Sequence, residues 1–138
     1  MKKTYQIQRG LSVKAGESKT FNFQLKENYA KCTGFFLTPS TANTDFSVLT
    51  LLLNVAQMEV LPNGTDASLF ALTDYISRAD ATYDFKEENI PAKSSDVQLI
   101  VTNNAPTKDA EGNPLKDEKG NPIDNTQTFN VYFVLENF

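Results

Sequence analysis

Apolar and polar residues alternate along most of this chain. A period of two places every second side chain on the same face of an extended strand, whereas an amphipathic helix repeats its apolar residues every three or four positions. The alternation is clearest near the C-terminus, where single residues separate Phe129, Val131, Phe133 and Leu135. The pattern therefore predicts a protein built from strands that have one covered face.

Similar segments recur throughout the chain without a strand-helix-strand rhythm. The predicted strands comprise residues 5–13, 20–25, 32–37, 46–55, 82–85, 96–103 and 126–136. Residues 66–77 alone have helical spacing, with Asp66 as a candidate N-cap. A chain of 138 residues fits a single domain, 1–138. We expect an all-β fold, an antiparallel, jelly-roll-like β-sandwich with at most one short helix and one long polar arm.

Two local features refine this prediction. The Gly-containing link at residues 14–17 has the length of a hairpin connection between its flanking strands. Residues 46–55 are apolar enough to form a central strand covered on both faces, with a bulge near Asn54. The expected core comprises Phe21, Phe23, Phe46, Leu49, Leu51, Leu53, Val101, Phe129, Val131 and Phe133.

The polar arm is expected at residues 104–125, which contain the one internal repeat. The sequence DAEGNPL at residues 109–115 recurs eight residues later as DEKGNPI at residues 117–123. Gly tolerates a positive φ and Pro fixes φ, so each unit has the chemistry of a turn. The candidate site residues are those that the two units share: Asp109, Gly112, Asn113, Pro114, Leu115, Asp117, Gly120, Asn121, Pro122 and Ile123.

Three interpretations of the arm are open. It is an assembly arm anchored on a neighbouring subunit by Leu115 and Ile123, or a mobile hairpin without a function, or a calcium loop. An EF-hand aligned on Gly112 places Thr107 where the first acidic ligand belongs, which disfavours calcium. Two large aliphatic residues cannot offset a backbone entropy of about 1–2 kcal/mol per ordered residue. We therefore expect the arm to be ordered by a neighbour.

Composition excludes several classes of function. The chain has no His and a single cysteine, Cys32, so an imidazole base, a zinc site that uses His and an internal disulfide are all absent. Thirteen basic against seventeen acidic residues give a net charge of −4, which argues against nucleic-acid binding. Residues 4–9 are too polar for the apolar part of a signal peptide, and no apolar run is long enough to span a membrane. We expect no enzymatic activity, cofactor or metal, and we interpret Cys32 as a small core residue.

Three segments carry a resemblance to a known class of proteins. They are YAKCTGFF at residues 29–36, MEVLPNG at residues 58–64 and FNVYFVLEN at residues 129–137. In these segments the chain resembles small β-sandwich virion proteins of tailed bacteriophages, particularly crAss-like phages of gut Bacteroidota. The resemblance implies a capsid auxiliary or decoration protein, or a head-fibre component, that packs against a major capsid protein or its own copies. It implies no catalytic residue.

The function expected from these observations is therefore structural. The predicted protein is a homo-oligomeric virion component, made in the host cytoplasm, that assembles through strand edges and the extended loop. Its predicted partners are other copies of itself and a major capsid or neighbouring virion protein, with no nucleic acid and no membrane. The alternative is a carbohydrate-binding or adhesin-like β-sandwich module with a concave face lined by tyrosines.

Overall fold

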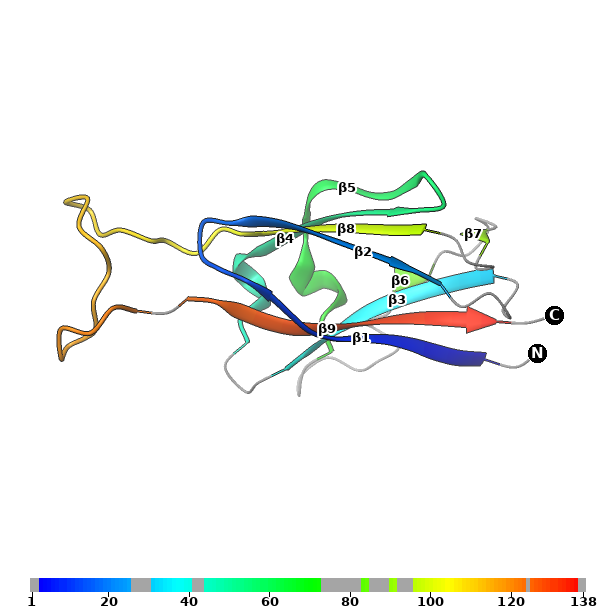
Figure 1. The fold of residues 1–138 in the computed structure, drawn as a ribbon, viewed down its shortest axis with the longest axis horizontal. Coiled ribbons are helices and arrows are strands. Elements are labelled where there is room, and N and C mark those ends of the chain that lie inside the picture. The colour runs from blue at the N-terminus through cyan, green and yellow to red at the C-terminus, as the bar shows by residue number, and fades with distance from the viewer. Residues whose placement is uncertain are drawn as a thin grey trace.

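The computed structural model describes residues 3–25, 31–40, 44–72, 83–84, 90–91, 96–123 and 125–136. In these ranges, strands form two antiparallel sheets that face each other (Figure 1). The first sheet contains β1 (Lys3–Val13), β9 (Gln127–Glu136), β3 (Lys31–Pro39), β6 (Tyr83–Asp84) and β7 (Ile90–Pro91). The second contains β2 (Ser18–Gln24), β8 (Asp96–Asn103), β4 (Leu49–Val55) and β5 (Met58–Asp66). The predicted all-β sandwich is confirmed.

The strand pairing is that of a jelly roll. The strand order is β1-β9-β3-β6 in the first sheet, where β7 also pairs with β3, and β2-β8-β4-β5 in the second. Thus β1 pairs with β9, β2 with β8, β3 with β6 and β7, and β4 with β5. The chain is a long antiparallel ribbon that turns back between β4 and β5 and is wrapped into two sheets, which is jelly-roll topology.

The hairpin predicted at residues 14–17 is wrong. β1 and β2 lie in different sheets, so this link is a corner between the sheets. The N–H of Gly16 donates to the carbonyl of Asn103 (2.8 Å), and the N–H of Asn103 donates to the carbonyl of Glu17 (2.9 Å). Gly16 has a φ of +78°, which permits this corner. A short Gly-containing link is compatible with a hairpin and with a corner. The corner forms here because β1 pairs with β9 in one sheet and β2 pairs with β8 in the other.

The core lies between the sheets and follows the predicted alternation. In β9 the side chains of Phe129, Val131, Phe133 and Leu135 are fully buried. Most of the predicted core residues are confirmed as buried: Phe46, Leu49, Leu51, Leu53, Val101, Phe129, Val131 and Phe133. Phe21 and Phe23, on the edge strand β2, are half-buried and pack against this core. Their rings contact Phe129 and Phe133 at centroid distances of 6.4 Å and 5.4 Å.

The predicted central strand at residues 46–55 is partly wrong. Its first turn is a 3-10 helix, η1 (Phe46–Val48), because the carboxylate of Asp45 accepts a hydrogen bond from the N–H of Ser47. β4 then alternates buried and half-buried residues, so one of its faces is covered instead of both. The bulge is confirmed, since the register between β4 and β5 shifts on both sides of Leu53.

The predicted helix at residues 66–77 is also shorter than expected. Asp66 caps it as predicted, accepting a hydrogen bond from the N–H of Ser68, but the helix is a single 3-10 turn, η2 (Ala67–Phe70). Residues 73–77 lie outside the described residues. The predicted short strand at residues 82–85 is observed as β6, and residues 82 and 85 are not among those described.

Phe133 provides a direct test of the core. Its side chain is fully buried between Phe23 and Phe35, so Phe133→Ala leaves a cavity where the two sheets meet. We expect the free energy of unfolding, measured by urea denaturation, to fall by about 3–5 kcal/mol. The matched control is Leu69→Ala on η2, where the side chain is 62% exposed and a change below about 0.5 kcal/mol is expected. Equal losses in the two variants would contradict this core.

Candidate assembly arm and polar groove

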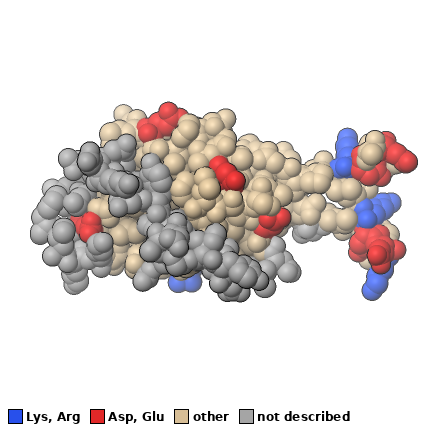
Figure 2. Space-filling model, turned by 180° about the vertical axis from the view of Figure 1, so that it is seen from behind, with Lys and Arg blue, Asp and Glu red and all other residues tan. Residues whose placement is uncertain are grey.

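Residues 104–125 connect β8 to β9, and the described residues 104–123 project from the end of the sandwich that lies opposite both chain termini (Figure 1). From residue 106 to residue 123, all of which are described, every residue is exposed except the half-buried Leu115. Figure 2 shows that acidic and basic side chains gather at the far end of this arm. The segment therefore adds no residue to the core beyond its base, and nearly all of its side chains are exposed.

Each repeat in the arm closes into the same turn. In the first repeat, Oδ1 of Asp109 accepts hydrogen bonds from the N–H groups of Glu111 and Asn113, both at 2.9 Å. The N–H of Asp109 donates to the carbonyl of Asn113 (2.8 Å), and Gly112 has a φ of +84°. The second repeat has the same bonds eight residues later, around Asp117. The shared Asp and Gly residues are therefore the ones that the turn requires.

The two turns are joined by hydrogen bonds at the repeat interval. The N–H of Leu115 donates to the carbonyl of Thr107 (3.4 Å), and the N–H of Ile123 donates to the carbonyl of Leu115 (3.1 Å). Antiparallel bridges at the two Pro residues, Lys108 with Pro114 and Lys116 with Pro122, close each unit. The arm is thus two consecutive copies of the same hydrogen-bonded turn. Leu115 links them, because its N–H donates to Thr107 and its carbonyl accepts from Ile123.

A buried side chain, Asn103, holds the base of the arm. Asn103 has an exposed fraction of 0%, and its Nδ2 donates to the carbonyls of Val13 (2.9 Å) and Asn125 (2.8 Å). Its Oδ1 accepts a hydrogen bond from the N–H of Ala105 (3.0 Å). Asn125 in turn donates to the carbonyl of Pro106 (3.2 Å). One amide therefore fixes both ends of the arm to the sandwich.

These bonds give the arm internal contacts that the expectation of an arm ordered only by a neighbour did not include. The estimate from the sequence counted the apolar surface that the arm buries and omitted the hydrogen bonds of the two Asp side chains. Asn103 was not identified either, although the sequence contains a signal for it. Asn103 continues the inward-facing series Val97, Leu99 and Val101 in β8, and a polar residue at a core position needs hydrogen-bond partners.

All ten candidate site residues lie in this tandem, five in each turn. Their role as assembly contacts stays a prediction. The calcium interpretation gains no support. In the described ranges, no group of three or more His, Cys, Asp or Glu side chains is arranged to hold a metal ion. The same ranges contain no helix long and apolar enough to span a membrane.

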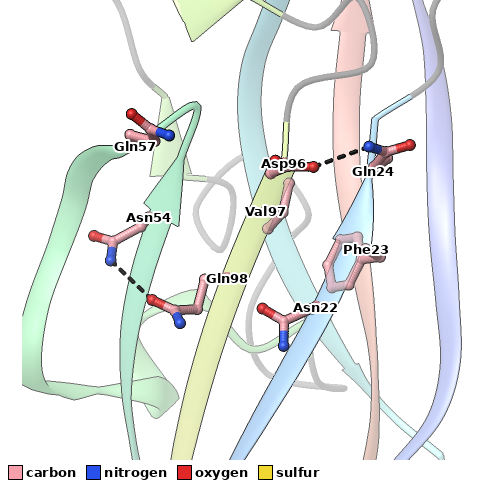
Figure 3. A pocket seen from close by; sticks show the side chains of 8 residues that line it. All are labelled: Asn22, Phe23, Gln24, Asn54, Gln57, Asp96, Val97 and Gln98. Atoms are coloured by element: carbon pink, nitrogen blue, oxygen red, sulfur yellow. Dashed lines mark hydrogen bonds between the residues drawn. The ribbon is translucent and has the colours of Figure 1, made fainter.

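A second candidate site, which the sequence did not reveal, lies on the second sheet at the end away from the arm. It is a groove of about 680 Å³ (Figure 3). Its lining residues come from β2, β4, β8 and the β4–β5 turn: Asn22, Phe23, Gln24, Asn54, Gln57, Asp96, Val97 and Gln98. In β8, Gln98 is exposed and Val97 is buried, so the polar residues of the groove are on the outer face of the sheet.

Neutral amide groups dominate this groove. The strand register places Gln98 opposite both Asn22 and Asn54. Nδ2 of Asn54 donates to Oε1 of Gln98 (3.3 Å), and Nε2 of Gln24 donates to Oδ1 of Asp96 (3.0 Å). Among the described residues that line the groove, Asp96 alone carries a charge. The site therefore offers neutral hydrogen-bond donors and acceptors.

The tyrosine-lined binding face expected for a carbohydrate module is not this groove. Tyr132 stacks on Phe36 at a centroid distance of 4.8 Å and an interplanar angle of 15°, and Tyr5 packs edge-on against both rings. These rings belong to the first sheet, and Phe36 is buried. Tyr5 and Tyr132 therefore pack on each other and on Phe36 within their own sheet, and Tyr5 stays 36% exposed there.

Cys32 is confirmed as a core residue. Its side chain is 1% exposed, and the thiol donates a hydrogen bond to the carbonyl of Gly34 (3.6 Å). Burial raises the pKa of the thiol to about 12. The thiol is thus protonated at neutral pH and is not a nucleophile.

Comparisons with protein-family models, with curated proteins and with solved structures return no match to this chain. The fold assignment therefore rests on the strand pairing.

Replacing Asn103 tests how the arm is held. Asn103→Ala leaves the buried N–H of Ala105 and two carbonyls without their partner, so we expect a loss of at least about 2 kcal/mol in unfolding free energy. Hydrogen exchange of the arm amides should accelerate in the same variant.

The neighbouring residue supplies the control. Asn104 is exposed, and among the described residues its side-chain amide donates a single hydrogen bond, to Oγ1 of Thr50 (3.3 Å). Asn104→Ala should change the unfolding free energy by less than about 1 kcal/mol and leave exchange in the arm unaltered. Identical exchange in the two variants would show that Asn103 does not hold the arm.

Proposed function

We propose that this protein is a non-enzymatic structural subunit that assembles with a neighbouring molecule through residues 104–125. The observation that supports this most strongly is a tandem of hydrogen-bonded turns, held at its base by Asn103, whose exposed residues stand clear of the core. Because the turns are formed before binding, a partner meets a preorganised surface and less conformational entropy is lost on association.

The surface of the arm suits a protein partner. Ile123 is 43% exposed, and the half-buried Leu115 lies beside it in the ladder, which gives the arm a small apolar contact. The same two turns carry lysines and carboxylates, and charges of both signs gather at the far end of the arm (Figure 2). Mixed charges around an apolar centre favour specificity over tight nonspecific adhesion.

The strand edges support the proposal less well than the arm. β1 has a register shift between Gln8 and Leu11, and Gly10 there has a φ of +70°. β5 contains Pro62 and is interrupted by register shifts against β4. Bulges and prolines protect an edge from pairing with another chain. We therefore assign the main contact to the arm.

A bacteriophage virion is the setting that we propose for this assembly. The support is the resemblance of residues 29–36, 58–64 and 129–137 to small virion proteins of tailed phages, together with the use of jelly rolls in viral capsid domains. The proposed partners are copies of the same chain and a major capsid protein or a neighbouring virion protein.

Replacing the arm tests this proposal. In a variant in which a short Gly-Ser linker replaces residues 108–124, Asn103 and Asn125 are kept, so the sandwich should fold normally. Size-exclusion chromatography with light scattering should detect self-association of the wild-type protein and a monomeric variant. The wild-type chain should also be detected by mass spectrometry in purified phage particles, and the variant should not.

A point variant with a matched control narrows the test to the apolar contact. Ile123→Ser removes an exposed aliphatic side chain from the arm, and Leu69→Ser removes one from the body of the sandwich. Only the first should weaken association. The proposal fails if the shortened protein assembles and enters particles as the wild type does, or if the wild type does neither.

A further inference from the structure

We infer that the groove on the second sheet is a binding site for a neutral oligosaccharide. The site lies apart from the arm, so this inference does not depend on the proposed assembly role. It rests on the register of the amide side chains, on their hydrogen-bonding capacity, on the charge of the groove and on the turn that contributes Gln57 to it (Figure 3).

The amides form a row across three adjacent strands. Asn22 of β2, Gln98 of β8 and Asn54 of β4 occupy the same level of the sheet, because the register pairs Gln98 with each of the other two. Adjacent strands are about 4.8 Å apart, which is close to the width of one pyranose ring. Successive amides can therefore contact hydroxyl groups on opposite sides of a sugar ring or on consecutive rings.

Several N–H donors and carbonyl acceptors in the groove make no hydrogen bond to another described residue. Each side-chain amide has two N–H donors and one carbonyl acceptor. Asn54 and Gln98 use one donor and one acceptor on each other. The side chains of Asn22 and Gln57 make no hydrogen bond to another described residue, and both are exposed. A sugar hydroxyl, which both donates and accepts, matches these groups.

The charge of the groove favours a neutral ligand. Asp96 is the single charged residue among the described residues that line it, and Gln24 already donates a hydrogen bond to its carboxylate. An anionic ligand would be repelled by this carboxylate, and no described lysine or arginine lines the groove to attract one. A cationic ligand would find one partner in a site whose other polar groups are neutral.

The turn between β4 and β5 provides an independent observation. Ala56 and Gln57 have φ values of 52° and 66°, and every other described residue with a positive φ is a glycine. A two-residue hairpin of this kind prefers Asn-Gly, because side chains disfavour the left-handed region. Glycine in place of Gln57 would relieve the turn and remove an amide from the groove. Strained residues of this kind are concentrated at functional sites.

The groove and the arm occupy opposite ends of the molecule. β8 runs from Asp96 in the groove to Asn103 at the base of the arm, and seven residue steps of about 3.3 Å separate them by roughly 23 Å. A subunit that is held through its arm therefore leaves the groove open to solvent.

Nuclear magnetic resonance of the full chain tests the inference, because side-chain amides give resolved signals in ¹H–¹⁵N spectra. The probes are neutral tetrasaccharides of glucose, xylose, mannose and galactose, with tetragalacturonate as the acidic comparison. At least one neutral probe should shift the side-chain signals of Asn22, Asn54, Gln57 and Gln98. Asn22→Ala and Gln98→Ala should each weaken that binding about tenfold.

Asn63→Ala supplies the matched control, because Asn63 is an exposed amide on β5 of the same sheet that does not line the groove. It should bind the saccharide as the wild type does. The inference is overturned if no neutral probe shifts these signals at millimolar concentration, or if only the acidic probe does. It is also overturned if the signals shift with protein concentration in the absence of saccharide, because a second copy then covers the groove.

Discussion

The side-chain amide of Asn103 is the interaction on which the shape of this molecule depends. It lies fully buried at the end of β8 and bonds to the end of β1 through Val13, to the start of the arm through Ala105 and to the end of the arm through Asn125. Its backbone also bonds to the corner between β1 and β2. A buried amide is stable only when its polar atoms have partners, so these contacts fix one another. The two sheets and the arm are consequently held in one arrangement.

The arm shows how a polar segment is ordered without a core. Asp109 and Asp117 each accept two backbone N–H groups, and the repeat interval lets corresponding residues of the two turns bond to each other. These local bonds reduce the number of conformations available to the segment, which lowers the entropy that a partner must remove on binding. In the assembly that we propose, a chain of 15.4 kDa thereby gains contact surface beyond what its own core provides.

Local sequence patterns predicted the strands well, but not how distant segments meet. Alternation identified β8 and β9 because one face of each strand is buried, and the repeat located both turns of the arm. The corner at residues 14–17 was missed because its geometry is decided by strands far away in the sequence. The groove was missed for the same reason, since its amides converge only through the register of β2, β8 and β4. The role of Asn103 was also missed, although the local sequence indicates it: Asn103 is a polar residue in the inward-facing, otherwise apolar series of β8.

Backbone ¹⁵N relaxation of the 138-residue chain, recorded at a concentration low enough to keep it monomeric, tests most directly whether the arm is held by its own bonds. If Asn103 and the two Asp side chains order the arm, the amides of residues 109–121 should have order parameters of about 0.85, like those of β8 and β9. Values below about 0.6 across these residues would show that the arm is flexible until a partner binds, and would contradict a preorganised arm.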